Sequence, residues 1–295
     1  MTAHANPKLI GMREADESAI VSSERFIIRP ATADDIKEMS GVLERAGLSS
    51  SRPEIVEFNL ASSGTQMFVG CRDGRVAGVG GCVRFGRTGW LGNVAVDDDV
   101  RGQGLGRAIS QTAVDRLQQA GVETVLLTAT ELGRPIYERL GFTDESVSYG
   151  IWEQPRPLIL GCDRSATVRR GQIDAVIRQD AEATGEDRRG YLAPFADRAW
   201  VAAGPGQAGY WVALPWGGGP VIAANAASAR PLIVEMIRTS PGSRLAFPEL
   251  NAHGAALAVS LGFHLARRVR RMRLGPPVPG YRPGAIYNVF SLAAG

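Results

Sequence analysis

The sequence has little of what several classes of protein depend on. Its three cysteines, Cys71, Cys82 and Cys162, are far apart and odd in number, which argues against a disulfide framework. Three histidines are too few for a histidine-rich site, so no metal is expected. No apolar run approaches the roughly 18 residues that a membrane-spanning helix needs. Residues 1–17 lack the apolar core of a signal peptide, so we expect a loose tail and a cytoplasmic location.

Lysine is almost absent, and the charge is divided unevenly along the chain. Only Lys8 and Lys37 are lysines, a bias that a G+C-rich genome explains better than function does. Residues 1–153 carry 16 basic and 21 acidic side chains, whereas residues 154–295 carry 17 and 9. The basic second half could favour an anionic partner. The length of 295 residues allows two domains, and 44% apolar with 21% charged residues is typical of a soluble globular protein.

The stretch VAVDDDVRGQGLGRAI, residues 94–109, contains the most informative motif. It does not match the dinucleotide fingerprint, because Arg107 stands where the third glycine belongs, and it lacks the lysine of a nucleoside-triphosphate loop. It does fit R-x-x-G-x-G directly after a strand-like segment, residues 91–96. The glycines let a backbone turn and approach a ligand closely, and the N–H groups of residues 103–107 are the unpaired donors of a helix start.

With positive charge from Arg101 and Arg107, this loop predicts a pyrophosphate site. The alternative is a glycine-rich turn that binds nothing.

Hydrophobic periodicity and turn residues predict alternating strands and helices along the first half. Thr32 and Asp35 form a capping box before a helical pattern, and Pro53 suits the first turn of a second helix. We expect strands at 26–29, 66–71, 75–85, 91–96, 123–129 and 142–152, helices at 36–43, 53–61, 104–120 and 134–141, and a linker at 155–165.

The second half repeats this pattern at a period of about 120 residues, which is typical of two copies of one fold. Residues 167–170 echo the opening strand, residues 198–204 and 210–214 predict a hairpin, and residues 219–224 precede a predicted helix. Leu-Gly-Phe closes a short helix at 140–142 and again at 261–263.

The order of elements, the loop motif and Tyr137 in PIYERLGF together resemble the GNAT superfamily of acyl-CoA-dependent N-acetyltransferases over residues 25–153. The resemblance implies an α/β chain of the α+β type, with two consecutive GNAT folds, each a mixed, mostly antiparallel twisted sheet flanked by helices. The expected division is a flexible tail (1–24), a catalytic acetyl-CoA-binding domain (25–153), a linker (154–165) and a degenerate GNAT-like domain (166–295).

The same resemblance assigns roles to residues of the first domain. Tyr137 would protonate the departing thiolate; the alternative is a tyrosine that only packs beneath the loop. The strand before the loop would pair with the pantetheine as an added strand does. The residues implied to contact acetyl-CoA, the expected co-substrate, are Val94, Ala95, Val96, Arg101, Gly102, Gln103, Gly104, Leu105, Gly106, Arg107, Thr130 and Gly133.

The second copy departs from this pattern. Alignment on Leu-Gly-Phe puts Ala258 at the position of Tyr137, and the segment matching the loop, residues 223–230, has no glycine. The segments 180–188 and 270–275 resemble the second domain of bacterial tandem GNAT proteins. We therefore expect the second copy to have lost the cofactor site and to shape the acceptor pocket or support the first copy.

Residues that could contact the acceptor are less well marked. Glu57 and Glu131 are candidate bases, although each is more simply a solvated charge. Glu249 and Asn251 could touch the acceptor, or Asn251 could cap a helix. Arg271 could hold a carboxylate or phosphate.

Other charged groups favour structural roles. Asp97, Asp98 and Asp99 could attract a cationic amine, but turn and cap chemistry is the simpler interpretation. Asp180 and Arg188 predict an ion pair, and the arginine-rich residues 267–273 predict a solvated or interdomain strand rather than a nucleic-acid surface.

The sequence thus predicts transfer of an acetyl group to a primary amine on a small molecule. Acetylation of a protein lysine or amino terminus and a non-catalytic acyl-CoA sensor remain as alternatives. Neither a nucleic-acid nor a membrane partner is expected, and the protein would be a monomer or a homodimer.

Overall fold

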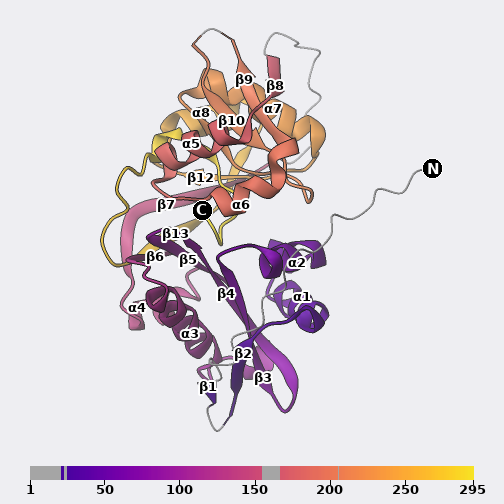
Figure 1. Ribbon diagram of the computed structural model, residues 1–295, viewed down its shortest axis with the longest axis vertical. Coiled ribbons are helices and arrows are strands. Elements are labelled where there is room, and N and C mark those ends of the chain that lie inside the picture. Colours follow the sequence, from indigo (N-terminus) through magenta and orange to yellow (C-terminus); the bar gives the residue numbers. More distant parts are fainter. Residues whose placement is uncertain (1–20, 23–24, 155–166, 205) are drawn as a thin grey trace, which may run out of the picture.

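The computed structural model describes residues 21–22, 25–154, 167–204 and 206–295. Two sheets, each flanked by helices, lie one beyond the other along the longest axis, the first half in indigo and magenta and the second in orange (Figure 1). The predicted linker, residues 155–165, and Cys162 fall outside the described residues. Cys71 and Cys82 are free thiols. In the described part of the chain, no helix combines the length and apolarity needed to cross a membrane.

The larger sheet has nine strands in the order β1-β2-β3-β4-β5-β6-β13-β7-β12. Residues 21–22, inside the segment expected to be a tail, form β1 and pair with β2. The elements of the first half are β1 (Val21–Ser22), β2 (Ile27–Pro30), α1 (Ile36–Arg45), α2 (Pro53–Ala61), β3 (Thr65–Arg72), β4 (Arg75–Phe85), β5 (Thr88–Val96), α3 (Leu105–Gln119), β6 (Thr124–Ala129), α4 (Arg134–Arg139) and β7 (Thr143–Glu153).

Helices cover both faces of this sheet. On one face, Met39 and Val42 of α1 pack with Val69 and Val79 of β3 and β4. On the other, α3 packs so closely that a Cβ added at Gly80 would lie 2.4 Å from Ile109 Cγ2. Because the glycines of β3 and β4 have no side chains, α3 packs directly on these strands, and this contact fixes the start of α3 against the sheet.

The second half builds a five-stranded sheet in the order β14-β11-β10-β9-β8. Hairpin pairing of β9 with β10 matches the hairpin expected from the sequence. The elements of the second half are β8 (Thr167–Arg170), α5 (Ile173–Thr184), α6 (Arg189–Leu192), β9 (Ala199–Ala203), β10 (Gly209–Val212), β11 (Val221–Ala223), α7 (Ala226–Thr239), β12 (Leu245–Pro248), α8 (Ala252–Ser260), β13 (His264–Leu274) and β14 (Ile286–Asn288). Of these strands, β12 and β13 belong to the nine-stranded sheet.

The two halves exchange strands. β13, from the second half, lies between β6 and β7 of the first half and pairs antiparallel with both. β7 in turn pairs with β12 of the second half. The predicted boundary at residues 154–165 thus separates the two repeats in sequence, but the nine-stranded sheet crosses it. Backbone hydrogen bonds of β7 and β13 hold the halves together.

The repeated Leu-Gly-Phe segments have the same local geometry. Gly141 and Gly262 have φ of 87° and 77°, the left-handed conformation that ends a helix. The N–H of Phe142 donates to the carbonyl of Tyr137, and the N–H of Phe263 donates to that of Ala258, both at 3.0 Å. Tyr137 and Ala258 accept equivalent backbone hydrogen bonds, so the correspondence inferred from the sequence is confirmed.

Candidate active site

Two parallel strands of the first half part from each other and open a split in the sheet. β5 and β6 pair only from Thr88–Trp90 against Thr124–Leu126, and then diverge. Asn93 has φ of 56°, and the pairing of β5 with β4 shifts register at the same level. This bulge turns β5 away from β6. Beyond Trp90, the edge of β5 that faces β6 is therefore available to an added extended chain.

The glycine loop lies where β5 leads into α3, at the open end of the split. Gly102 and Gly104 have φ of 75° and 91°, and a Cβ at either would meet no atom within 4 Å. They are needed for backbone conformation, not for packing, and the space beside them is open. The first helical hydrogen bond runs from the Ala108 N–H to the Gly104 carbonyl. The N–H groups before it have no acceptor within the helix and can bind an anion.

A network of ion pairs fixes the approach to the loop. Buried Asp97 accepts hydrogen bonds from Arg45 at 2.8 and 3.1 Å and from Arg75 at 2.8 Å. Arg75 also pairs with Asp99 at 2.7 Å, and Arg101 pairs with Asp98 at 2.7 Å. Asp98 and Asp99 lie in a single helical turn, residues 98–100, as the turn interpretation predicted, but the Asp97 side chain does not cap that turn and instead pairs with arginines.

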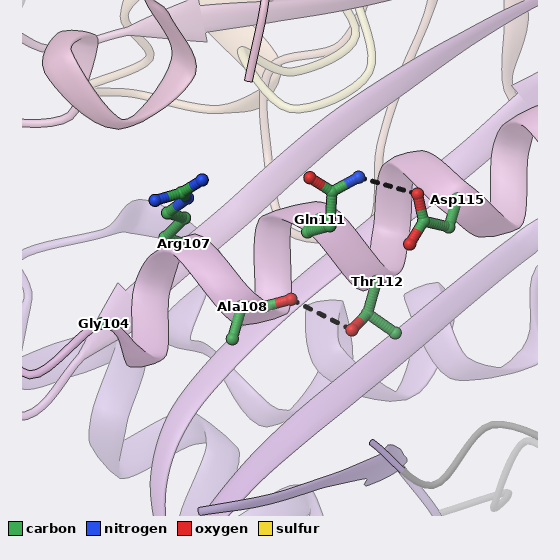
Figure 2. A pocket seen from close by; sticks show the side chains of 6 residues that line it. All are labelled: Gly104, Arg107, Ala108, Gln111, Thr112 and Asp115. Carbon is green, nitrogen blue, oxygen red and sulfur yellow. Dashed lines mark hydrogen bonds between the residues drawn. The ribbon is translucent and has the colours of Figure 1, made fainter. Parts of the chain in front are cut away.

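Two side chains of the loop hydrogen-bond back to the chain that precedes it, and Arg107 lies on the first turn of α3. Arg101 Nε donates to the Val96 carbonyl at 3.2 Å, and Gln103 donates to the Asp99 carbonyl at 3.1 Å. Arg107 borders a depression of about 300 Å³ next to the loop (Figure 2). The lining residues are Gly104, Arg107, Ala108, Gln111, Thr112 and Asp115.

Tyr137 lies in α4, 9% exposed, on the same face of the sheet as α3. Its ring meets Phe142 edge-on at 6.1 Å between centroids. Burial raises the pKa of Tyr137 to about 12. At the end of β6, the Gly133 N–H donates to the carbonyl and hydroxyl oxygens of Thr130 at 3.0 and 3.2 Å. A Cβ at Gly133 would lie 3.2 Å from the Tyr137 ring, so this turn packs directly on the tyrosine.

Most of the predicted acceptor contacts have other partners in the structure. Glu131 is exposed and pairs with Arg270 at 3.4 Å, and Glu249 pairs with Arg268 at 2.6 Å. Glu57 is exposed on α2.

Asn251 begins α8: its side-chain oxygen accepts from the Gly254 N–H at 2.8 Å, and its amide donates to the Ile286 carbonyl at 2.9 Å. The capping interpretation of Asn251 is confirmed.

Arg271 is buried at the junction of the two halves. Its side chain is 2% exposed and pairs with Glu145 at 2.9 Å. The guanidinium lies 4.0 Å from the Tyr281 ring centroid and 5.6 Å from that of Trp90. Its Nη1 atom has no hydrogen-bond partner among the described residues. Arg271 lies on β13, and of the two alternatives predicted for this strand, solvated or interdomain, the structure shows the interdomain one.

A second charged cluster joins the halves. Asp180 and Arg188 form the expected ion pair at 2.6 Å, both almost fully buried. Glu186 accepts hydrogen bonds from Thr88 at 3.0 Å and from Trp90 Nε1 at 2.8 Å, and burial raises its pKa. Glu186 lies within the 180–188 segment, but nothing in the sequence predicted that it would be buried against Thr88 and Trp90.

In the second half, a strand of the chain itself fills the equivalent split. β14 pairs with β11 on one side. On the other, the Val289 N–H donates to the Ala246 carbonyl of β12 at 2.9 Å. Asn288 bridges the two sides, because its oxygen accepts from the Ala246 N–H at 2.7 Å and its amide donates to the Gly219 carbonyl at 2.7 Å. The backbone groups that remain available in the first split are thus used in the second.

Comparisons with known proteins agree with this architecture. Residues 63–144 match one family model and residues 176–288 match another, both described as an acetyltransferase (GNAT) domain. A crystal structure from Pyrococcus horikoshii superposes with a TM-score of 0.81 at 20% identity, covering 93% of this chain and 98% of that one. A GCN5-related N-acetyltransferase from Sphaerobacter thermophilus gives 0.60 at 16% identity, covering 86% and 96%. These likenesses show the fold.

A curated relative adds a likeness in sequence. The [Ribosomal protein bS18]-alanine N-acetyltransferase of Escherichia coli K12 is 38% identical over 60 residues. These residues are 19% of this chain, and the match spans 40% of the length of that relative. The two family matches lie on the two repeats and confirm the predicted fold class. The chain therefore belongs to the GNAT acetyltransferases and carries two GNAT domains in tandem.

Proposed function

We propose that this protein is an N-acetyltransferase that moves an acetyl group from acetyl-CoA to a primary amine of a small molecule, by direct attack in a ternary complex. One observation carries the proposal. The first domain combines an open split, a glycine loop at the open end of that split and a buried tyrosine on the same face of the sheet as α3. In the second domain β14 fills the split, residues 223–230 contain no glycine and Ala258 stands at the position of the tyrosine.

The residues present fit acetyl-CoA. The pyrophosphate would take the free N–H groups of residues 103–107, with Arg101 and Arg107 adding positive charge. Open space beside Gly102 and Gly104 allows the close approach that such binding needs. The pantetheine would pair with the edge of β5 at residues 94–96, and Thr130 and Gly133 would border its other side.

Tyr137 is suited to act as an acid and not as a base. Bound acetyl-CoA supplies an activated thioester. The amine nitrogen bonds to the acetyl carbon, the carbon–sulfur bond breaks with its electron pair going to sulfur, and Tyr137 donates its proton to that sulfur. Solvent takes the proton released by the amine and reprotonates the tyrosine. With its pKa raised to about 12, Tyr137 remains protonated at neutral pH. Burial also raises the basicity of the departing thiolate.

The second domain is proposed to be degenerate and to support the first. Ala258 provides no acid at the position equivalent to Tyr137, and β14 fills the split that a pantetheine would need.

A protein amino terminus is the second candidate acceptor, because the curated Escherichia coli relative acts on the alanine of a ribosomal protein. The second domain packs over the face of the first sheet opposite α3, which supports the smaller acceptor instead.

The experiment measures thiol release from acetyl-CoA with a panel of amines, amino acids, aminoglycosides and peptides, including an alanyl peptide. Tyr137→Phe is compared with Tyr287→Phe, which loses a buried hydroxyl in the second domain. Amine-dependent release that Tyr137→Phe abolishes and Tyr287→Phe preserves would support the proposal. Tight acetyl-CoA binding by calorimetry without release from any acceptor would support the sensor, and the absence of binding would refute the cofactor site.

A further inference from the structure

The end of the described chain, residues 291–295, lies where β5 and β6 part. A Cβ added at Gly92 would fall 2.4 Å from the Cβ of Ala293, so the two backbones are in close contact. Across the split, Thr128 Oγ1 donates a hydrogen bond to the Leu292 carbonyl at 2.7 Å. Gly92 and Thr128 each come two residues after the last paired position of their strand. The segment therefore touches both strands just beyond the point of divergence.

The segment lies on the face of the sheet opposite α3. Leu91 and Leu127 belong to the core cluster with α3, whereas Trp90 and Leu126 belong to the core shared with the second domain. Alternation along each strand puts Gly92 and Thr128 on the second-domain face. The split thus has the glycine loop and α3 on one face and residues 291–295 on the other.

The second domain anchors this segment firmly. Immediately before it, β14 is held between β11 and β12. The Phe290 ring lies 4.6 Å from Tyr191 and 5.9 Å from Phe58, between the second domain and α2. Buried Arg188 donates to the carbonyls of Ala294 at 3.4 Å and Gly295 at 2.5 Å. In Figure 1, the C label accordingly lies between the two halves, close to β5 and β13.

We propose that residues 291–294 form the wall of the acceptor site and that Ala293 sets the size of the amine it admits, a role that rests on the proposed function. β14 fills the split of the second domain and leads directly into residues 291–294, so its hydrogen bonds hold this wall in position. Acetyl-CoA enters from the α3 face, so the amine reaches the acetyl group from the second-domain face, past Ala293. The preferred acceptor carries its amino group on an unbranched carbon, because the methyl group of Ala293 leaves little room beside Gly92.

The test compares Ala293→Leu and Ala293→Gly with Val259→Leu, a control on the exposed surface of α8. The KM of the best amine and the KM of acetyl-CoA are measured separately. Rates are also compared for that amine and for an analogue with a methyl branch beside the nitrogen. Ala293→Leu adds three carbon atoms and is expected to raise the amine KM by about tenfold or more, because one extra methylene in a pocket already costs about tenfold. The acetyl-CoA KM should change less than about twofold. Ala293→Gly is expected to raise the relative rate on the branched analogue several-fold.

The outcomes separate the two proposals. An unchanged amine KM and preference in both Ala293 variants, with normal wild-type turnover, would refute the wall alone, as would equal rises in both KM values for Ala293→Leu. A wild-type protein without amine-dependent thiol release would refute the proposed function and the wall with it. If Ala293→Leu does not fold, Ala293→Gly and Thr128→Val carry the test, because neither adds volume and the second removes the hydrogen bond to Leu292.

Discussion

Replacing Gly104 with alanine tests whether the conformation of the loop is what binds acetyl-CoA. A Cβ at Gly104 would meet no atom within 4 Å, so the substitution introduces no clash. It does force an alanine to adopt φ of 91°, and a left-handed backbone costs an L-residue about 1–2 kcal/mol. If the loop relieves this strain by moving out of its binding conformation, the same energy is lost from binding. Every 1.4 kcal/mol is tenfold in affinity, so the Kd for acetyl-CoA should rise about 5- to 30-fold.

Gly121 provides the matched control at the other end of the same helix. It has φ of 78°, and a Cβ there would also meet no atom within 4 Å. Gly121→Ala should therefore lower the free energy of unfolding by a similar amount, about 1–2 kcal/mol, without changing acetyl-CoA binding. Urea denaturation measures the stability of both variants, and calorimetric titration measures binding. Equal Kd values for Gly104→Ala and wild type, or equal losses of affinity in the two variants, would refute the cofactor role of the loop.

Three further predictions follow from the same geometry. Burial raises the pKa of Tyr137 to about 12, so the phenol stays protonated at neutral pH. The value of kcat/KM should therefore rise with pH as the amine loses its proton, and it should not decrease at pH values below about 10. A decrease in kcat/KM near pH 8 that Tyr137→Phe removes would contradict this. Arg188→Ala should lower the free energy of unfolding by about 3–5 kcal/mol in urea denaturation, because it leaves Asp180 buried without its partner; a loss under about 1 kcal/mol would show that the pair is dispensable. Asn288→Ala removes hydrogen bonds that hold β14 on both sides, and β14 in turn holds residues 291–294, the proposed wall of the acceptor site. The amine KM should therefore rise while the Kd for acetyl-CoA stays unchanged. A higher Kd for acetyl-CoA with an unchanged amine KM would place the cofactor in the second domain.

Local sequence patterns predicted most elements of both repeats, because the signals are short-range. The capping box at Thr32 and Asp35 forms, with Asp35 accepting from the Thr32 N–H at 2.8 Å, and α1 follows it directly. The strand before the glycine loop and the long helix after it are β5 and α3. Gly102 and Gly104 of the loop adopt the positive φ that only glycine takes readily, whereas Gly106 lies inside α3.

The pairing of distant strands could not be predicted in the same way. The sequence predicted a strand at residues 267–273, and β13 forms there with Val269 and Arg271 both buried. It does not specify which neighbour accepts its hydrogen bonds, so the exchange of β7 and β13 between the halves was missed. The positive φ of Asn93 was not predicted either, although asparagine is among the few residues other than glycine that adopt this conformation.

The contact of residues 291–295 with the first split could not be predicted from the sequence either. Ala293 and Ala294 have no polar group to suggest a binding role, and their contacts come from the path of β14 through the second domain. The sequence places Gly92 within a predicted strand and gives no further signal, whereas the structure requires a glycine there because Ala293 lies against it.

The most direct test of the central claim is to measure, for Tyr137→Phe and wild type, both the rate of amine-dependent thiol release and the Kd for acetyl-CoA. Loss of a positioned acid should reduce kcat by about 100-fold or more, while the Kd stays within about twofold, because the hydroxyl acts only as the thiolate leaves. An unchanged rate, or a rate that falls only in proportion to a weaker Kd, would contradict the assignment of Tyr137 as the acid.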